Sequence, residues 1–248
     1  MINELNQHNY FCRYVSDKVS NFSADMLSAD YWQAKDAITG SAQGRGTTWF
    51  IQYQSDKSSS PVQQWVLRHY YRGGLIGKVI NDSYFFTGIE NTRAAKEFAL
   101  LHHLQSLNLP APLPIAFGIK RSGLFYQADL LSSRIENAQD LVAILSEQPL
   151  NGEVWQRIGA TIKRFHHHNI YHHDLNAHNI LLDDKQQVFI IDFDQGEVRN
   201  QSNNTWQQGN IARLKRSFVK ELNKLDNFHF NEESWQQLLS GYNQKESH

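Results

Sequence analysis

Three oxygen-bearing side chains near the middle of this 248-residue chain have the types and spacing of a phosphoryl-transfer site. The segment HHDLNAHN at 172–179 contains Asp174 and Asn179, five residues apart, and Asp192 follows thirteen residues after Asn179 in the segment IIDFD. A phosphoryl group in transit spreads negative charge over its oxygens, so a divalent cation beside it and a carboxylate facing the acceptor hydroxyl both favour transfer. Mg²⁺ prefers oxygen ligands and is usually held by only one or two carboxylates together with phosphate oxygens. The pattern therefore predicts that Asp174 receives the proton and that Asn179 and Asp192 hold the metal.

An apolar hairpin is expected to bring two of these residues together. Ile180–Leu182 and Val188–Ile191 are β-favouring runs, and the polar segment Asp183–Gln187 separates them. Asn179 and Asp192 flank the two runs, so pairing of the strands would place them side by side. Asp and Asn also favour turns for conformational reasons alone, but that alternative accounts for a single pair better than for three residues at these intervals.

The bulk properties are those of an ordinary globular protein without a membrane span. Hydrophobic residues make up 40% and charged residues 20% of the chain, and the length suits one large domain or two small lobes. The net charge of −1 gives no bulk attraction to nucleic acid. Cys12 is the single cysteine, which excludes an internal disulfide framework and fits a reducing compartment. No apolar signal region and no run of about 18 apolar residues is visible, so any membrane association is expected to be peripheral.

The first half of the chain favours a small antiparallel sheet with one helix. A glycine-bearing segment at 40–46 leads into β-favouring residues at 47–53, and further strands are expected at 63–71 and 123–131. Three prolines require the segment 108–118 to be extended. The first 35 residues show too weak a pattern for a role to be assigned.

The helix expected between these strands carries a carboxylate on its apolar side. The hydroxyl of Thr92 can cap its first turn. Its apolar stripe consists of Ala94, Phe98, Leu101 and Leu104. Glu97 falls on the same stripe, and a carboxylate on an apolar face needs a partner.

The second half is expected to be mostly helical. Helical periodicity covers 139–145 and 153–167, before the loop and hairpin described above. A further amphipathic helix is marked by Ile211, Leu214, Phe218, Leu222 and Leu225. Its other side carries Arg213, Lys215, Arg216 and Lys220.

These motifs together resemble a reduced eukaryotic-type protein-kinase fold. The general likeness rests on RFHHHNIYHHDLNAHNILLD and FIIDFD. A narrower likeness to the bacterial lipopolysaccharide-core kinases, in particular those acting on 3-deoxy-D-manno-octulosonic acid (Kdo), rests on GRGTTWF, VLRHYYRGGLIGKV, RAAKEF, LPAPLPIAFG and WQQGNIARLKRSFVK. It runs from about Gly40 to about Lys220. The resemblance implies a bilobal α+β fold formed by one kinase-like domain over 1–248, with an antiparallel-sheet N-lobe at about 36–131 and a mostly helical C-lobe at about 132–248.

The resemblance implies a role for each matching residue of the second half. Asp174 looks like the catalytic aspartate, and Asn179 and Asp192 look like the ligands of Mg²⁺. Asp194 stands where the family of protein kinases has a glycine after the metal-binding aspartate, and it would either join the metal site or restrain the turn. No activation segment follows, which argues against a regulated protein kinase.

The same resemblance implies how ATP would be bound. Gly40, Gly44 and Gly46 look like the loop over its phosphates, although their order differs from the usual G-x-G-x-x-G. Arg68 stands where a nucleotide-binding lysine is usual, and Glu97 would be its helix partner. Lys78 is the alternative phosphate contact. The backbone of Ala128–Leu130 is expected to meet the adenine.

The implied acceptor is a hydroxyl of Kdo, the 4-hydroxyl, on a lipid A precursor. Such a substrate carries phosphates and a carboxylate in a leaflet facing the cytoplasm, so a peripheral enzyme at the cytoplasmic side of the bacterial inner membrane is expected. Basic residues suited to the acceptor are Arg72, Lys78, Arg213 and Arg216, although scattered charges are more often simply solvated surface. No nucleic acid or protein partner is implied.

Other functions remain open at this point. An aminoglycoside- or choline-type small-molecule kinase shares the H-x-D-x-x-x-x-N layout, and a catalytically inactive kinase fold could serve as a binding module. The histidine-rich segment 166–173 suggests zinc, but neighbouring histidines on a helix point in different directions. His172 is instead expected to pack in the loop and to hydrogen-bond the backbone.

Overall fold

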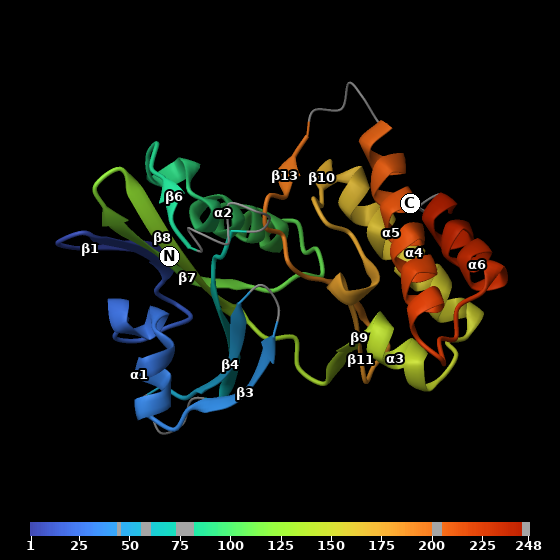
Figure 1. Cartoon of the computed structure of the whole chain (residues 1–248), viewed down its shortest axis with the longest axis horizontal. Coiled ribbons are helices and arrows are strands. Elements are labelled where there is room, and N and C mark those ends of the chain that lie inside the picture. Colours follow the sequence, from blue (N-terminus) through green and yellow to red (C-terminus); the bar gives the residue numbers. More distant parts are fainter. Residues whose placement is uncertain (44–45, 56–60, 73–81, 200–204, 245–248) are drawn as a thin grey trace. The chain divides into compact units, whose positions relative to one another are not determined.

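The computed structural model describes residues 1–43, 46–55, 61–72, 82–199 and 205–244, which form two compact units. Unit 1 comprises Met1–His102 and Pro112–Arg134, and unit 2 comprises His103–Ala111 and Ile135–His248. Unit 1 is built around a sheet, whereas unit 2 is mostly helical (Figure 1). The positions predicted to do chemistry are divided between the two units.

An antiparallel sheet of eight strands forms the body of unit 1. Its strands are β1 (Ile2–Gln7), β2 (Tyr10–Val15), β3 (Ile38–Gln43), β4 (Thr47–Tyr53), β5 (Gln63–His69), β6 (Tyr84–Phe85), β7 (Pro114–Ser122) and β8 (Phe125–Ser133). Seven follow the order β1-β2-β7-β8-β5-β4-β3, and β6 pairs with β8. The strands expected near 47–53, 63–71 and 123–131 are confirmed. The sheet is larger than expected, because the first 15 residues add β1 and β2 to it.

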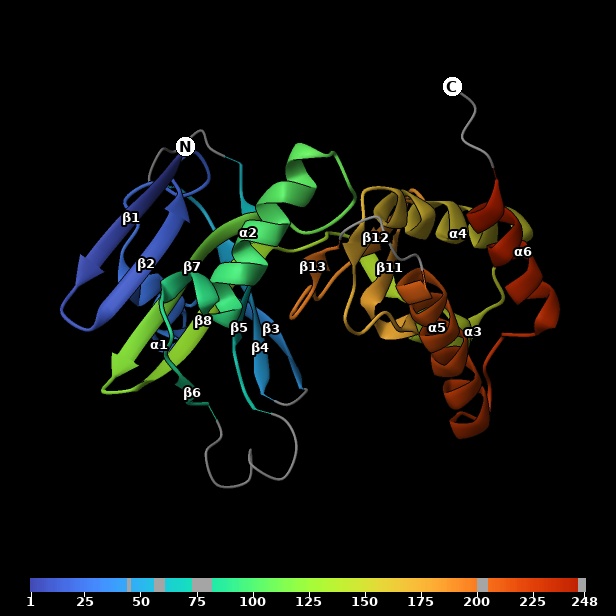
Figure 2. The ribbon, with the colours of Figure 1, turned by 90° about the horizontal axis from the view of Figure 1, so that it is seen from above.

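Helical elements cover both faces of this sheet (Figure 2). They are η1 (Ala24–Leu27), α1 (Ala29–Ala34), η3 (Ile89–Asn91) and α2 (Arg93–Ser106). On one face Trp32 of α1 is buried and its ring packs edge-on against Trp65 of β5, with centroids 5.9 Å apart. On the other face Phe98 of α2 packs against Phe117 of β7, with centroids 5.2 Å apart. The hydroxyl of Thr92 accepts from the Ala95 amide at 3.4 Å, as the predicted cap requires.

The described residues of unit 2 form a short loop-and-hairpin segment and four α-helices. Its elements are β9 (Ala138–Asp140), α3 (Leu141–Glu147), α4 (Gly152–His167), β10 (Ile170–Tyr171), η4 (Ala177–Asn179), β11 (Ile180–Asp183), β12 (Val188–Ile190), β13 (Glu197–Val198), α5 (Thr205–Lys224) and α6 (Glu232–Asn243). The predicted hairpin is β11–β12, with Ile180 opposite Ile190. Asp140 and Asn151 cap α3 and α4 by accepting backbone amides, so both helices begin where side-chain acceptors are available.

Helices α4 and α6 approach so closely that two glycines are required between them. A Cβ atom added to Gly159 would lie 1.9 Å from the carbonyl oxygen of Leu238, and one added to Gly241 would lie 1.9 Å from that of Gln156. The two glycines therefore allow direct backbone-to-backbone packing of the pair.

The predicted apolar stripe of α5 is only partly correct. Leu214 and Phe218 are fully buried, but Leu222 is 41% exposed and Leu225 follows the end of the helix. The buried face instead includes two polar residues, Asn210 and Glu221. Their burial reflects specific hydrogen bonds, which hydrophobic periodicity does not reveal. No helix within the described ranges is both long and apolar enough to span a bilayer.

Candidate active site

The loop at 172–179 folds around the backbone carbonyl of Asp174. This oxygen accepts from Asn176 Nδ2 at 3.1 Å and from Asn179 Nδ2 at 3.0 Å. The side-chain oxygen of Asn176 accepts from the amides of His178 and Asn179, which starts the short helix η4. Asp174 itself remains exposed. The polar residues of the loop therefore fix its backbone and leave the Asp174 carboxylate accessible.

His172 connects this loop to the segment that precedes Asp192. Its Nδ1 accepts from the Asp174 amide at 3.1 Å, so the proton lies on Nε2, which donates to the Ile191 carbonyl at 2.9 Å. The ring is buried, and burial lowers the pKa of His172 below its ordinary value. The neutral ring thus holds two backbone segments in one position, and the predicted packed loop histidine is confirmed.

The hairpin places Asn179 next to the segment that contains Asp192. The Ile191 amide donates to the Asn179 carbonyl at 3.0 Å, immediately beyond the paired part of β11 and β12. Asp192 adopts a left-handed backbone conformation with φ +62°, which is uncommon for a non-glycine residue and often marks a functional turn. Phe193 is fully buried and stacks on Phe165 of α4, anchoring the turn. The predicted hairpin therefore brings Asn179 beside the turn that contains Asp192, and metal binding by these two residues stays a prediction.

Helix α5 supports the loop through side chains on one face. Asn210 is 2% exposed, and its amide group donates to the His172 carbonyl at 2.9 Å and accepts from the His172 amide at 3.4 Å. Ser217 accepts from the Ala177 amide at 3.0 Å. These two residues and Arg213 are spaced i, i+3, i+7, the spacing of one helix face. The loop is therefore held from outside at both of its ends.

Arg213 places a positive charge beside the predicted base. Its Nη1 lies 3.6 Å from Asp174 Oδ1, and both side chains remain about half exposed. An arginine in this position can bind an anionic group of a substrate whose hydroxyl faces Asp174. Arg216 is exposed on the same helix, and its predicted contact with the acceptor stays a prediction.

In unit 1 the expected ion pair between Arg68 and Glu97 is present. The Glu97 carboxylate is 3% exposed and accepts from Arg68 Nη2. It also accepts from the hydroxyl of Tyr70 at 2.6 Å. Burial, followed by the charge of Glu97, raises the pKa of Tyr70 well above its ordinary value, so Tyr70 stays a donor. The carboxylate on the apolar stripe of α2 thus accepts hydrogen bonds from Arg68 of strand β5 and from Tyr70, the residue after that strand.

The three glycines assigned to the phosphate loop have different positions. Gly40 lies within β3, opposite Phe50 and next to an irregularity in the strand register, and its role over the ATP phosphates stays a prediction. Gly46 lies just before β4, where a Cβ atom would lie 2.0 Å from the ring of Tyr71. Gly44 lies outside the described residues, as does Lys78, the alternative phosphate contact.

The expected adenine contact with the backbone of Ala128–Leu130 is wrong. This segment lies in β8, which pairs with β7 on one side and β5 on the other. A strand flanked on both sides directs its backbone amides and carbonyls to its neighbours. Those groups are therefore committed to the sheet.

Arg72 belongs to an arginine–tyrosine cluster at the start of α2. Its guanidinium carbon lies 5.0 Å from the ring centre of Tyr84, and that of Arg93 lies 5.2 Å from the same ring. Arg93 Nη1 also donates to the Tyr84 hydroxyl at 2.8 Å. The predicted contact between Arg72 and the acceptor stays a prediction.

Sequence reasoning missed Tyr70, Asn210 and Ser217. Tyr70 stands two residues after Arg68, the spacing that puts side chains on the same side of an extended segment. Asn210 and Ser217 bracket Arg213 at helical spacing. The regular spacing of the three missed residues from Arg68 or Arg213 is the signal that could have revealed them.

The donor chemistry of Asn179 and Asp192 fits Mg²⁺. Asn179 uses its Nδ2 group to donate to Asp174, which assigns its remaining side-chain oxygen to the acceptor or ligand role. Asp192 contributes a carboxylate from the adjoining turn. One amide oxygen and one carboxylate match a site that phosphate oxygens would complete. In the parts of the chain that the structure describes, no group of three or more His, Cys, Asp or Glu side chains is placed to hold a metal.

A sheet unit in which Arg68 pairs with the buried Glu97 and a helical unit with an H-x-D-x-x-x-x-N loop define a phosphotransferase of the protein-kinase-like α+β fold. The chain belongs to the lipopolysaccharide kinase (Kdo/WaaP) family, whose model matches residues 29–242.

Named relatives cover most of the chain at substantial identity. It is 49% identical over 195 residues to the 3-deoxy-D-manno-octulosonic acid kinase of Vibrio cholerae serotype O1, covering 79% of each chain. It is 46% identical to the kinase of the same name from Vibrio vulnificus strain YJ016, covering 92% of this chain and 93% of the relative. The kinase of that name from Haemophilus influenzae strain 86-028NP is 41% identical, with 98% and 100% covered.

Proposed function

We propose that this chain transfers the γ-phosphoryl group of ATP to the 4-hydroxyl of a Kdo residue on a lipid A precursor, in the biosynthesis of the lipopolysaccharide core. The observation that carries the proposal is the placement of Arg213 beside Asp174, 3.6 Å between Nη1 and Oδ1. This arrangement combines a proton acceptor with a group that binds anions, as an acceptor sugar with a carboxylate requires. The names of the relatives support the same substrate.

In the proposed reaction the acceptor oxygen forms a bond to the γ-phosphorus. The bond from that phosphorus to the bridging oxygen breaks, and ADP leaves. The proton of the acceptor hydroxyl passes to the Asp174 carboxylate, and hydrogen bonds between the Asp174 backbone and the side chains of His172 and Asn179 hold that residue in position. Asn179 and Asp192 would hold Mg²⁺, which supplies charge neutralisation on the phosphate oxygens. Catalysis then rests on positioning and electrostatics.

Arg68 is the proposed nucleotide contact of unit 1. Its guanidinium group donates to the Glu97 carboxylate, which the Tyr70 hydroxyl holds through a second hydrogen bond. A planar cation oriented in this way suits phosphate oxygens. Gly40, Gly44 and Gly46 are proposed to line the nucleotide site as positions without side chains.

The proposed acceptor is carried by a lipid, so we place the enzyme at the cytoplasmic face of the bacterial inner membrane as a peripheral protein. The support is chemical: an enzyme must reach the head group of an acceptor that stays in the bilayer. Basic residues attract such a protein to an anionic surface.

Transfer of label from γ-labelled ATP to Kdo-modified lipid A precursor tests this function. Asp174→Asn keeps the shape of the side chain but removes its basicity, and we expect kcat to fall by about 10²–10⁴-fold while ATP affinity stays unchanged. Asp184→Asn is the matched control, because Asp184 is exposed in the β11–β12 turn. Analysis of the phosphorylated sugar by nuclear magnetic resonance identifies the hydroxyl.

Three results would contradict the proposal in different ways. Labelling of a soluble amino sugar or choline, but not of the lipid, would favour a small-molecule kinase. Binding of ATP without transfer to any acceptor would favour an inactive binding module. An Asp174→Asn variant with the kcat of the unaltered chain would remove Asp174 from the role of base.

A further inference from the structure

One end of the sheet in unit 1 presents a contiguous group of apolar side chains to solvent. Phe85 of β6 is 57% exposed, Leu124 in the β7–β8 turn is 66% exposed, and Phe125 of β8 is 42% exposed. Phe85 pairs with Phe125 across the strands, with ring centres 6.2 Å apart. The Phe86 amide donates to the Leu124 carbonyl at 2.9 Å, which ties the turn to β6. We call Phe85, Leu124 and Phe125 the hairpin-tip patch.

The patch lies at the tip of a hairpin, at one end of unit 1. Figure 2 shows the tip of the β7–β8 hairpin with β6 alongside it at one end of unit 1. Gly123 forms the turn with φ +59°, and nothing lies within 4 Å of the position of its missing Cβ atom. Single exposed apolar residues are normal on protein surfaces, but adjoining ones at a projecting tip mark an interaction site.

Cations adjoin the patch on strand β7. Lys120 and Arg121 are both exposed, and the guanidinium carbon of Arg121 lies 4.2 Å from the ring centre of Phe86. Asp82 carries a negative charge nearby, but it accepts from Gln127 and lies 3.4 Å from His69 Nε2. The charge that faces solvent beside the tip is therefore mainly positive.

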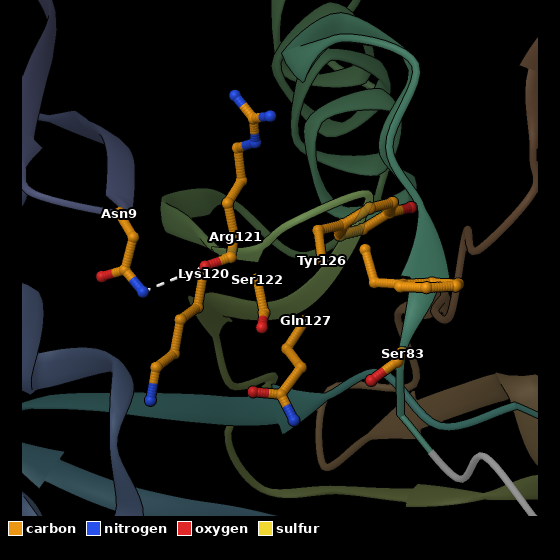
Figure 3. Close-up of a pocket in the computed structure, with 8 residues that line it drawn as sticks. Asn9, Ser83, Lys120, Arg121, Ser122, Tyr126 and Gln127 are labelled. Carbon is orange, nitrogen blue, oxygen red and sulfur yellow. Dashed lines mark hydrogen bonds between the residues drawn. The ribbon is translucent and has the colours of Figure 1, made fainter.

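A polar pocket of about 330 Å³ opens beside the patch and shares Phe125 with it. Its other lining residues are Asn9, Ser83, Lys120, Arg121, Ser122, Tyr126 and Gln127. Figure 3 shows the side chains of Lys120 and Gln127 directed to the same side, whereas that of Arg121 points away from them. Asn9 donates to the Arg121 carbonyl at 3.0 Å and so fixes one edge of the pocket. Ammonium, amide and hydroxyl donors in a pocket of this size suit a phosphate group.

We propose that the hairpin-tip patch docks this chain on an anionic phospholipid membrane. Aromatic and leucine side chains enter the interfacial layer, while Lys120 and Arg121 contact lipid phosphates and the pocket receives one head group. A protein partner fits less well, because the centre of a protein interface is broad and depleted of charge. The inference rests on the proposed function, which supplies a lipid-borne acceptor and thus a reason to dock.

Co-sedimentation with vesicles tests the docking surface directly. The intact chain is mixed with vesicles of phosphatidylcholine, either alone or with phosphatidylglycerol. We expect Phe85→Ser with Leu124→Ser to lower partitioning into the mixed vesicles at least about tenfold, from the lost apolar burial. Lys120→Gln with Arg121→Gln should remove the preference for phosphatidylglycerol. Val62→Ser is the matched control, because Val62 is 41% exposed in unit 1 but outside the patch.

Unchanged partitioning of the Phe85/Leu124 variant would overturn the proposal. A dimer of the unaltered chain that the same substitutions dissociate, without any effect on vesicle binding, would assign the patch to a second copy and would also overturn it.

Activity measurements separate this inference from the proposed function. With a water-soluble, deacylated Kdo acceptor the patch variant should keep its rate, whereas the rate on vesicle-borne acceptor should fall about tenfold. An equal rate on both acceptors would overturn docking through the patch. If the intact chain phosphorylates neither acceptor, the proposed function fails, while the sedimentation result still decides the docking surface.

Discussion

At the scale of single residues, the proposed chemistry depends on neighbours that hold charged groups in place. Glu97 is buried and shared by Arg68 and Tyr70. His172 donates through Nε2 and accepts through Nδ1, so one neutral ring fixes the backbones of both Asp174 and Ile191. Groups with no direct part in phosphoryl transfer therefore determine where the reacting groups lie.

Tyr70→Phe tests the first of these neighbours. The substitution removes a hydroxyl donor to the buried Glu97 carboxylate, so the free energy of unfolding should fall by about 1–2 kcal/mol. The KM for ATP should rise several-fold with little change in kcat, because Arg68 loses orientation rather than charge. Tyr53→Phe is the control: Tyr53 is also buried in the sheet, and its hydroxyl bonds to Ser20, away from Arg68. A purely structural role for Tyr70 would lower stability in both variants and leave both KM values unchanged.

Asp192→Asn tests the proposed metal ligand. Loss of the carboxylate should weaken ATP binding at least tenfold when Mg²⁺ is present and much less when it is absent. Isothermal titration with and without Mg²⁺ measures both affinities. Equal affinities of the variant and the unaltered chain for Mg-ATP would contradict the assignment.

At the scale of elements, unit 2 depends on hydrogen bonds from α5 to the 172–179 loop and on the close packing of α4 against α6. Asn210 and Ser217 of α5 form hydrogen bonds with the backbone of the 172–179 loop, and Gly159 and Gly241 let α4 and α6 touch through their backbones. Each contact joins segments far apart in the sequence.

Asn210→Ala should lower both the stability of the chain and its kcat, although Asn210 lies outside the 172–179 loop. The buried carbonyl and amide of His172 lose their partner, which costs about 1–3 kcal/mol for each group left unsatisfied. We expect kcat to fall at least tenfold because Asp174 moves with the loop. Gln208→Ala, at an exposed position of the same helix, should change neither quantity. Denaturant unfolding and steady-state kinetics on both variants decide the matter.

Gly159→Ala and Gly209→Ala should have opposite effects. At Gly159 a Cβ atom meets the Leu238 carbonyl at 1.9 Å, so overpacking should lower the free energy of unfolding by about 1–3 kcal/mol or more. At Gly209 of α5 a Cβ atom has nothing within 4 Å, and the better helix propensity of alanine should raise it by up to about 1 kcal/mol. Thermal or denaturant unfolding measures both, and effects of equal sign would refute the packing argument.

Local patterns predicted elements well and long-range pairing poorly. The apolar runs at 47–53 and 153–167 became β4 and α4 because their periodicity matches one burial geometry. The role of the first residues was not predictable, since β2 gains its partner from β7, where Cys12 lies opposite Gly118. In the site, the spacing of Asp174, Asn179 and Asp192 was visible, but Asn210 was not. An isolated polar residue in a helix shows its importance only when its buried partner is known.

At the scale of the whole molecule, stability should depend on pH through buried histidine. His166 is 2% exposed, its Nδ1 lies 2.7 Å from the Tyr242 hydroxyl of α6, and burial lowers its pKa to about 4. Lys163 and His172 are the charged and titratable groups that lower it further. In the unfolded chain the pKa returns to about 6.5.

The direction of this dependence follows from proton binding. Above about pH 6.5 neither state binds the proton, and the folded state keeps its full advantage; between about 6.5 and 4 only the unfolded chain binds it. Stability should therefore decline as pH falls through that window, by at most about 1.4 kcal/mol per pH unit from this group. His166→Gln should flatten the decline in denaturant titrations at several pH values. An unchanged slope would show that other groups dominate acid unfolding.

The hydrogen bonds from α5 also have a consequence during synthesis of the chain. The partners of His172 and Ala177 lie 38 and 40 residues downstream, at Asn210 and Ser217. A nascent chain that has emerged only as far as Asp192 already displays every predicted catalytic and metal-binding residue, but its loop still lacks these partners. Competence should thus appear late in translation, after α5 has left the ribosome, and a chain stalled before that point should be catalytically silent.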